Sequence, residues 1–301
     1  MTRSKAYLLT LLGASLWGTI GLFVEYLYQA GFTPWETVAI RAVFSAVFIV
    51  FILAVKFPGY LKIKMKDLPF FMGTGIVSIV FFNYCYFLVI QEASLSLAVV
   101  LLYTGPLFVT VLSRLLFKEW LTPRKLLALG FTITGCAFAV GLLPGFQTTV
   151  TTLAIAAGIA SGFFYALYSI FGKYVSRTYH SITITAYSFI CASLLMIPAG
   201  GLAAKSSLLF QPQVLLFAFG LAIVPTVLAY ILYTLGLTHI ESSRASILST
   251  IEPVVAIIIG VAVFGDRLDG WQTLGVLLVL SSVLLVAETK KTNTVLPADS
   301  L

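Results

Sequence analysis

The sequence of 301 residues has little charge: Asp, Glu, Lys and Arg make up 10% of it, whereas soluble domains contain about 25%. Its hydrophobic fraction is 60%, so a soluble fold of this size would lack the polar side chains needed to cover its surface. This composition excludes a cytosolic enzyme, a secreted disulfide scaffold and a disordered protein. It is typical of a polytopic membrane protein.

Cysteine and histidine are also scarce. Cys85, Cys136 and Cys191 lie far apart in apolar runs, so they predict neither a disulfide framework nor a metal site. His180 and His239 have no acidic or cysteine neighbours at the spacing of metal ligands. We therefore expect neither a metal nor a cofactor.

Long apolar runs are abundant. A helix that crosses ~30 Å of hydrocarbon needs about 20 residues at a rise of 1.5 Å each. The runs that meet this length are residues 7–28, 34–55, 69–90, 95–116, 124–143, 152–173, 181–202, 212–236, 243–264 and 270–288. They are continuous rather than alternating, which excludes a β-barrel. The sequence predicts an all-α integral membrane protein with ten transmembrane helices.

The basic residues indicate the orientation of these helices. If the N-terminus is cytoplasmic, 15 of the 18 Lys and Arg residues face the cytoplasm, only Lys205 and Arg267 face outward, and Arg41 lies within a span. This bias follows the positive-inside rule and predicts that both termini are cytoplasmic. The net charge of +7 is then a topology signal that favours contact with anionic lipid, and no nucleic-acid partner is expected.

The two halves of the sequence resemble each other. A shift of 147 residues places Pro106 on Pro253 and Tyr86 on Tyr233. Five spans per half is an odd number, so the second half must enter the membrane in the opposite orientation. Such inverted repeats are typical of secondary transporters, which bind substrate near the midplane at the repeat interface.

Several short motifs follow one another along the chain: Ser15-Leu16-Trp17-Gly18, Arg41, Gly105-Pro106, Phe117-Lys118-Glu119, Glu252-Pro253 and Phe264-Gly265-Asp266. In this order and spacing they resemble the drug/metabolite transporter superfamily and, within it, the EamA-type permeases. The resemblance implies two five-helix repeats, here 1–143 and 152–288, followed by a cytoplasmic polar tail at 289–301. It also implies a central cavity and the export or uptake of a small metabolite across a cell membrane, and the loop-poor chain suits a bacterial inner membrane.

An acidic side chain is predicted near the middle of the membrane. Glu252 lies nine residues into its span, and an ionisable group in hydrocarbon costs at least ~2.5–3.5 kcal/mol, so it needs an explanation. Pro253 and the Gly105-Pro106 pair predict matching helix breaks, which point to a transporter site and to gating. Glu252 either binds a proton or a cationic substrate group, or it forms a hydrogen bond that clamps a neighbouring helix.

A second charged pair lies closer to the outer surface. Helical rise places Arg41 and Glu25 at similar depths of ~5–10 Å. One interpretation is a mutual ion pair that holds adjacent helices together. The other is that Arg41 binds a substrate carboxylate, for which its planar guanidinium is suited, while Glu25 adjusts its charge.

Polar aromatic residues inside the spans form the third candidate group. Asn83, Tyr86, Tyr103, Tyr230 and Tyr233 lie away from the membrane interfaces, and a buried tyrosine hydroxyl needs a partner. Packing between helices explains any one of them, whereas the group together indicates the lining of a wet cavity.

These features predict a secondary active transporter rather than an enzyme. We expect it to move a small metabolite, such as an amino acid or amine, by alternating access, with an ion gradient as the energy source and protons as the candidate ion. The alternatives are a non-transporting membrane sensor or complex subunit and a membrane-embedded enzyme. The substrate, the direction of transport and the oligomeric state do not follow from the sequence.

Overall fold

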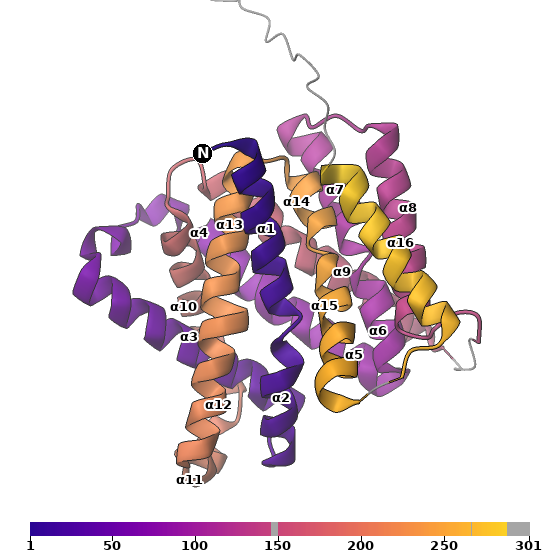
Figure 1. Cartoon of the computed structure of the whole chain (residues 1–301). Coiled ribbons are helices and arrows are strands. Elements are labelled where there is room, and N and C mark those ends of the chain that lie inside the picture. Colours follow the sequence, from indigo (N-terminus) through magenta and orange to yellow (C-terminus); the bar gives the residue numbers. More distant parts are fainter. Residues whose placement is uncertain (146–149, 266, 288–301) are drawn as a thin grey trace, which may run out of the picture.

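The computed structural model describes residues 1–145, 150–265 and 267–287, and all regular structure in these ranges is helical (Figure 1). Asp266, Lys290, Lys291 and the predicted tail 289–301 lie outside the described residues.

Nine helical segments in the described ranges are long and apolar enough to cross a membrane. They are Arg3–Gln29, Pro34–Lys56, Met65–Glu92, Leu95–Phe117, Thr152–Val175, Ser181–Ala199, Pro212–His239, Ser242–Phe264 and Gly270–Ala287. The remaining predicted span, 124–143, is α8 (Pro123–Ala139), which has 17 residues and is therefore about 26 Å long. It packs along α16 (Gly270–Ala287).

The starts of several helices follow from local sequence. Thr33, Thr122 and Thr151 each accept a hydrogen bond from a backbone N–H of the first helical turn. They thereby cap α3 (Pro34–Lys56), α8 and α9 (Thr152–Val175), respectively. Threonine side chains stabilise helix starts in this way. Proline suits the first helical position, as in α3 and α8, because a backbone N–H there would have no helical acceptor.

Many of the long segments are interrupted. The first segment consists of α1 (Arg3–Trp17) and α2 (Ile20–Gln29). The fourth consists of α6 (Leu95–Leu102) and α7 (Gly105–Phe117). The segment Ser242–Phe264 consists of α14 (Ser242–Leu248), α15 (Ile251–Ile259) and the π-turn η6 (Gly260–Phe264). Two more π-turns are η3 (Gly73–Val80), between α4 (Leu68–Met72) and α5 (Phe81–Glu92), and η5 (Ile223–Leu228), between α12 (Pro212–Ala222) and α13 (Ala229–His239). The η3 and η5 turns lie at equivalent places in the two halves, and π-turns are frequent at functional sites.

A further match between the halves is the left-handed residue that ends α7 and η6. Lys118 has φ +58° and Gly265 has φ +77°, and the two are 147 residues apart. Lys118 is the one non-glycine residue with positive φ in the described ranges. The repeat is therefore visible in backbone geometry as well as in sequence.

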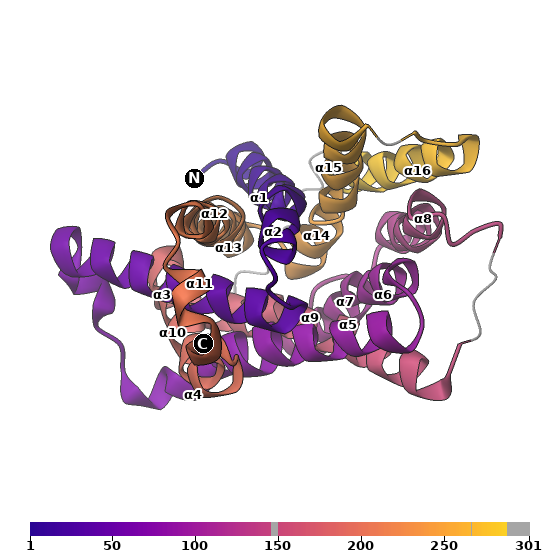
Figure 2. The ribbon, with the colours of Figure 1, turned by 90° about the horizontal axis from the view of Figure 1, so that it is seen from below.

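The two halves interleave rather than lying side by side. Helix α1 packs along α13, α3 packs on α10 (Ser181–Ala199) and α12, and α5 to α7 pack on α9. Seen along the bundle, α1 lies between α13 and α14 (Figure 2). The approach of α1 to α13 is close, because a Cβ atom at Gly13 would lie 2.6 Å from the backbone nitrogen of Tyr233. The interface between the repeats is thus the core of the molecule.

The connecting segments predicted to face the cytoplasm gather at one end, which also carries the N-terminus (Figure 1). There Tyr179 donates to Asp67 at 2.7 Å and Lys125 pairs with Glu241 at 3.1 Å. Burial and the hydrogen bond to Asp67 both raise the pKa of the Tyr179 hydroxyl. We call this the N-terminal end of the bundle. Side chains such as Phe51 and Leu284 are exposed along the outer faces of the spans, where lipid would cover them.

Candidate functional site

A narrow pocket lies in the core between the two halves. It is lined by Trp17, Ser78, Phe82, Tyr165, Tyr168, Ser169, Tyr230 and Tyr233. These residues come from α1, η3 and α5 of the first half and from α9 and α13 of the second half. The cavity volume is about 10 Å³, which is about the space of one water molecule.

The walls of the pocket are packed aromatic rings. The ring centroid of Trp17 lies 5.0 Å from that of Tyr230 and 4.9 Å from that of Tyr233. Tyr168 is also 4.9 Å from Tyr230, in an edge-to-face arrangement. Because such contacts fix the rings, their polar atoms have defined directions.

Arg41 reaches this pocket from α3. Its Nε donates to Thr226 Oγ1 at 2.9 Å, and its guanidinium lies over the ring of Tyr230, 5.8 Å from the centroid. Thr226 belongs to the π-turn η5 and donates in turn to the carbonyl of Leu221. The wide turn therefore positions the hydroxyl that holds Arg41 against the pocket wall.

The proposed ion pair between Arg41 and Glu25 does not occur. Glu25 accepts a hydrogen bond from Gln29, four residues along the same helix, at 3.0 Å. None of the ion pairs in the described part of the chain includes Arg41 or Glu25. Helical rise estimates the depth of a residue and not the direction of its side chain, and the two side chains contact different neighbours.

Glu252 lies at the middle of the segment Ser242–Phe264, in the first turn of α15. It is partly exposed. Arg41 and the Tyr103 hydroxyl are close enough to interact electrostatically with its carboxylate, as are the hydroxyls of Tyr86 and Tyr165. A carboxylate in the first turn of a helix is favoured by the helix dipole.

Glu252 is connected to the pocket through two residues. Tyr165, which lines the pocket, donates to Ser249 Oγ at 3.4 Å, and Ser249 lies in the gap between α14 and α15. Gly18 follows Trp17, and a Cβ atom there would lie 2.7 Å from the carbonyl oxygen of Glu252. One cationic and one anionic side chain thus flank the same aromatic pocket.

The helix breaks lie where the two proline motifs occur. In the first half, α6 ends at Leu102, and Gly105 and Pro106 are the first two residues of α7. In the second half, α14 ends at Leu248 and Pro253 is the third residue of α15. Each proline is thus in a first turn, where a backbone N–H has no helical acceptor.

The first break is held against α9. A Cβ atom at Gly162 would lie 2.9 Å from the carbonyl oxygen of Leu101, and one at Gly105 would lie 2.8 Å from Cδ1 of Tyr165. The gap in the helix therefore borders on the pocket-lining residue Tyr165.

The other predicted site residues have different surroundings. The Asn83 amide donates to the Ile79 carbonyl at 2.6 Å, one turn earlier in η3, so its nitrogen is used within its own membrane segment. Tyr233 lines the pocket, and its hydroxyl is 2.8 Å from Ser169 Oγ. Tyr103 is buried at the end of α6. Tyr86 packs between aromatic neighbours next to this region.

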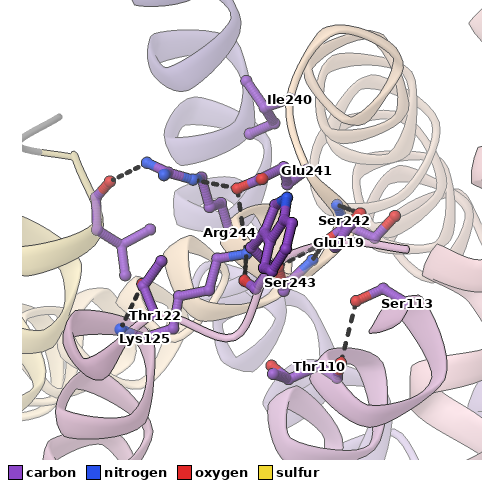
Figure 3. Close-up of polar contacts among 12 residues, drawn as sticks. Thr110, Ser113, Glu119, Thr122, Lys125, Ile240, Glu241, Ser242, Ser243 and Arg244 are labelled. Atoms are coloured by element: carbon purple, nitrogen blue, oxygen red, sulfur yellow. Dashed lines mark hydrogen bonds and ion pairs between the residues drawn. The ribbon is translucent and has the colours of Figure 1, made fainter. Parts of the chain in front are cut away.

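A second polar cluster, which the sequence did not suggest, closes the N-terminal end (Figure 3). Glu119 is 9% exposed, and its carboxylate accepts from the backbone N–H groups of Ser242 (2.6 Å) and Ser243 (3.1 Å) and from the Ser243 hydroxyl (2.5 Å). Glu119 follows α7 in the first half, whereas the two serines begin α14 in the second half. The carboxylate thus caps a helix across the repeat interface.

An ion-pair network supports this cap. Glu241 contacts Lys125 at 3.1 Å and also pairs with Arg244, whose guanidinium donates to the Tyr7 hydroxyl at 2.9 Å. Burial raises the pKa of Glu241, but the hydrogen bond from Arg244 and the charge of Lys125 outweigh this effect, so the pKa is below its usual value. We call Glu119, Ser242, Ser243 and this network the end clamp.

The sequence profile of the EamA-like transporter family matches residues 4–141 and 152–287. The chain belongs to the EamA-like transporter family. Each matched range covers one half of the chain, so two EamA-like repeats fit the sequence and the structure.

Curated relatives of this EamA-like transporter are themselves transporters. An uncharacterized transporter of Archaeoglobus fulgidus is 31% identical over 66% of this chain and 70% of its own length. The uncharacterized inner membrane transporter YicL of Salmonella typhimurium is 25% identical over 94% of this chain and 95% of its own length. The threonine/homoserine exporter RhtA of Escherichia coli is 28% identical over 64% of this chain and 62% of its own length.

A solved crystal structure has the same fold. It superposes with a TM-score of 0.75 and covers 94% of this chain and 96% of its own, at 18% identity. The family, the relatives and the apolar helices together establish a multi-pass membrane transporter, not an enzyme, that acts on a small molecule.

Proposed function

We propose that this EamA-like transporter moves a small zwitterionic metabolite, such as an amino acid, across a bacterial inner membrane by alternating access. The observation that supports this proposal is the pairing of opposite charges beside one pocket at the repeat interface. Arg41 would attract the substrate carboxylate and Glu252 its ammonium group or a coupling proton. The relatives that are threonine/homoserine exporters support amino acids as the substrate class.

The topology proposed for this mechanism has ten membrane helices, with α8 as the fifth, and both termini in the cytoplasm. The positive-inside bias and the gathering of the basic connections at one end support it. The N-terminal end is then the cytoplasmic end. Carriers built from inverted repeats bind substrate near the midplane, which supports a similar depth for this pocket.

In this mechanism the end clamp is the closed cytoplasmic gate. Opening toward the cytoplasm would separate α14 from the turn after α7, and the contacts of Glu119 with Ser242 and Ser243 would break. The opposite end carries the ion pair of Lys205 with Glu36, in which the lysine side chain is 32% exposed against 3% for Lys125 in the end clamp, so water screens its charge more strongly. The pocket would then open first toward the outside.

A pH-driven flux assay tests the role of Glu252. We expect purified protein in liposomes to transport threonine or homoserine in response to a pH gradient, and Glu252→Gln to abolish the response because the amide cannot carry a proton. Glu25→Gln is the matched control, since Glu25 is also an acid within a span but its carboxylate accepts from Gln29 of the same helix. A Glu252→Gln protein with a normal response to the gradient would refute proton coupling through this residue.

A further inference from the structure

Trp17 has a buried donor with no acceptor. Its side chain is 5% exposed, and the indole Nε1 has no hydrogen-bond partner within the described part of the chain. The other buried side-chain polar atoms without a hydrogen-bond partner in the described residues are the hydroxyls of Ser181, Thr185 and Ser242. A hydroxyl can rotate, whereas an indole N–H is a donor with a direction fixed by its ring. An unpaired buried donor is unfavourable, so its presence needs an explanation.

The ring of Trp17 has no room to turn toward another acceptor. It lies between Tyr230 and Tyr233, with centroid distances of 5.0 and 4.9 Å. The backbone next to it is equally confined, since a Cβ atom at Gly18 would clash with the carbonyl of Glu252 and with Val255. The indole therefore remains at the pocket wall, which it helps to form.

The neighbouring hydroxyls already have partners. Tyr168 Oη is 2.8 Å from Thr234 Oγ1, and Ser169 Oγ is 2.8 Å from Tyr233 Oη. Neither pair includes the Trp17 indole N–H, which has no acceptor within residues 1–145, 150–265 and 267–287. The free space beside these groups is about that of one oxygen-sized group.

We propose that Trp17 Nε1 is a specificity-determining donor of the transport site, and that it binds a carboxylate oxygen of the substrate. This assignment rests on the proposed function of the pocket. A carboxylate fits better than a neutral carbonyl because Tyr230 contacts both the Trp17 ring and, at 5.8 Å, the Arg41 guanidinium. The guanidinium and the indole thus share Tyr230 as a neighbour, and a positive charge on this side of the pocket favours an anionic acceptor.

The variant that tests this role is Trp17→Phe, which keeps an aromatic ring and removes the N–H. Trp35→Phe is the matched control, because the Trp35 indole has an acceptor, the Ala199 carbonyl at 3.0 Å, away from the pocket. In proteoliposomes we expect Trp17→Phe to raise the KM for threonine about tenfold, the effect of ~1.4 kcal/mol, with a smaller change in maximal rate. Inhibition by threoninol, which lacks the carboxylate, should change little.

A second measurement uses fluorescence and does not depend on that variant. A protein in which Trp35, Trp120 and Trp271 are replaced by Phe retains Trp17 alone, and threonine should shift its emission whereas threoninol should not. An unchanged KM in Trp17→Phe, or no emission shift by threonine in a protein that transports it, would overturn the assignment. A lower melting temperature of Trp17→Phe with an unchanged KM would also overturn the assignment, since it would mean that the indole N–H binds only a buried water that stabilises the fold.

The wild-type protein separates this inference from the proposed function. If it neither transports threonine and homoserine nor is stabilised by them against thermal unfolding, the zwitterion-transport proposal fails and the Trp17 assignment fails with it. If it transports them and Trp17→Phe behaves like Trp35→Phe, only the Trp17 assignment fails.

Discussion

Replacing Glu119 by Gln tests the end clamp most directly. The carboxylate offers two acceptor oxygens to three donors, at 2.5 to 3.1 Å from Ser242 and Ser243. Glutamine keeps one acceptor and turns the other into a donor, so at least one of the three hydrogen bonds is lost and a donor faces a donor. The negative charge at the start of α14 is lost as well.

The size of the effect follows from these contacts. A hydrogen bond to a charged group contributes about 1.5–3 kcal/mol, so Glu119→Gln should weaken the clamp by about 2–3 kcal/mol. At 1.4 kcal/mol per factor of ten, the population with α14 released should rise about 30- to 150-fold. The backbone amides of Ser242 and Ser243 should lose protection by the same factor.

Hydrogen exchange, measured by mass spectrometry on a peptide that covers residues 240–248, reports this loss of amide protection. The matched control is Glu36→Gln, because Glu36 also accepts from a backbone amide, that of Thr33 at 2.7 Å, but at the opposite end. It should increase exchange near residue 33 and leave 240–248 as in the wild type. If folded Glu119→Gln protein exchanges at 240–248 no faster than the wild type, Glu119 does not hold α14.

Two further predictions concern the clamp and the helix break. Because the folded-state pKa of Glu241 is below its usual value near 4.5, its contribution to stability is present above that value and lost as the pH falls through the folded pKa. The melting temperature in detergent should therefore decrease less between pH 7 and 3 in Glu241→Gln, and equal slopes would contradict the ion pairing. Gly162→Ala places a methyl group 2.9 Å from the Leu101 carbonyl and should cost about 1–3 kcal/mol in thermal or denaturant unfolding. Gly130→Ala, with no atom within 4 Å, should cost nothing, and equal stability of the two variants would refute the close packing.

Composition and hydropathy were sufficient to locate most of the helices. The predicted span 152–173 is α9 (Thr152–Val175), and the predicted span 270–288 agrees with α16 within the described residues. Apolar runs report that a segment crosses lipid, but they contain no information about a break inside it. The interruption at Gly18 and Thr19 and the π-turns η3 and η5 were therefore not predicted, because they depend on packing against other helices.

The site was predictable only where local sequence determines the backbone. Proline restricts the local backbone, so the breaks near Pro106 and Pro253 could be expected from sequence alone. Helical rise gives the depth of a residue but not the direction of its side chain, which is why an ion pair with Glu25 was one of the two interpretations of Arg41 and its contact with Thr226 was not predicted. The pocket residues on α9, such as Tyr168, have no sequence signal, since an aromatic side chain in an apolar run is usually packing.

The Phe117-Lys118-Glu119 motif shows how a short, weak sequence signal acquires a physical role in the fold. Lys118 adopts the left-handed conformation that ends α7, and the chain then turns so that Glu119 meets the start of α14. The same conformation recurs at Gly265, one repeat later. If the acidic residue only shaped its own turn, its partners would be local. Instead its three donors lie more than 120 residues away, in the other repeat. The motif is thus better explained by the contact between repeats than by the stability of either one.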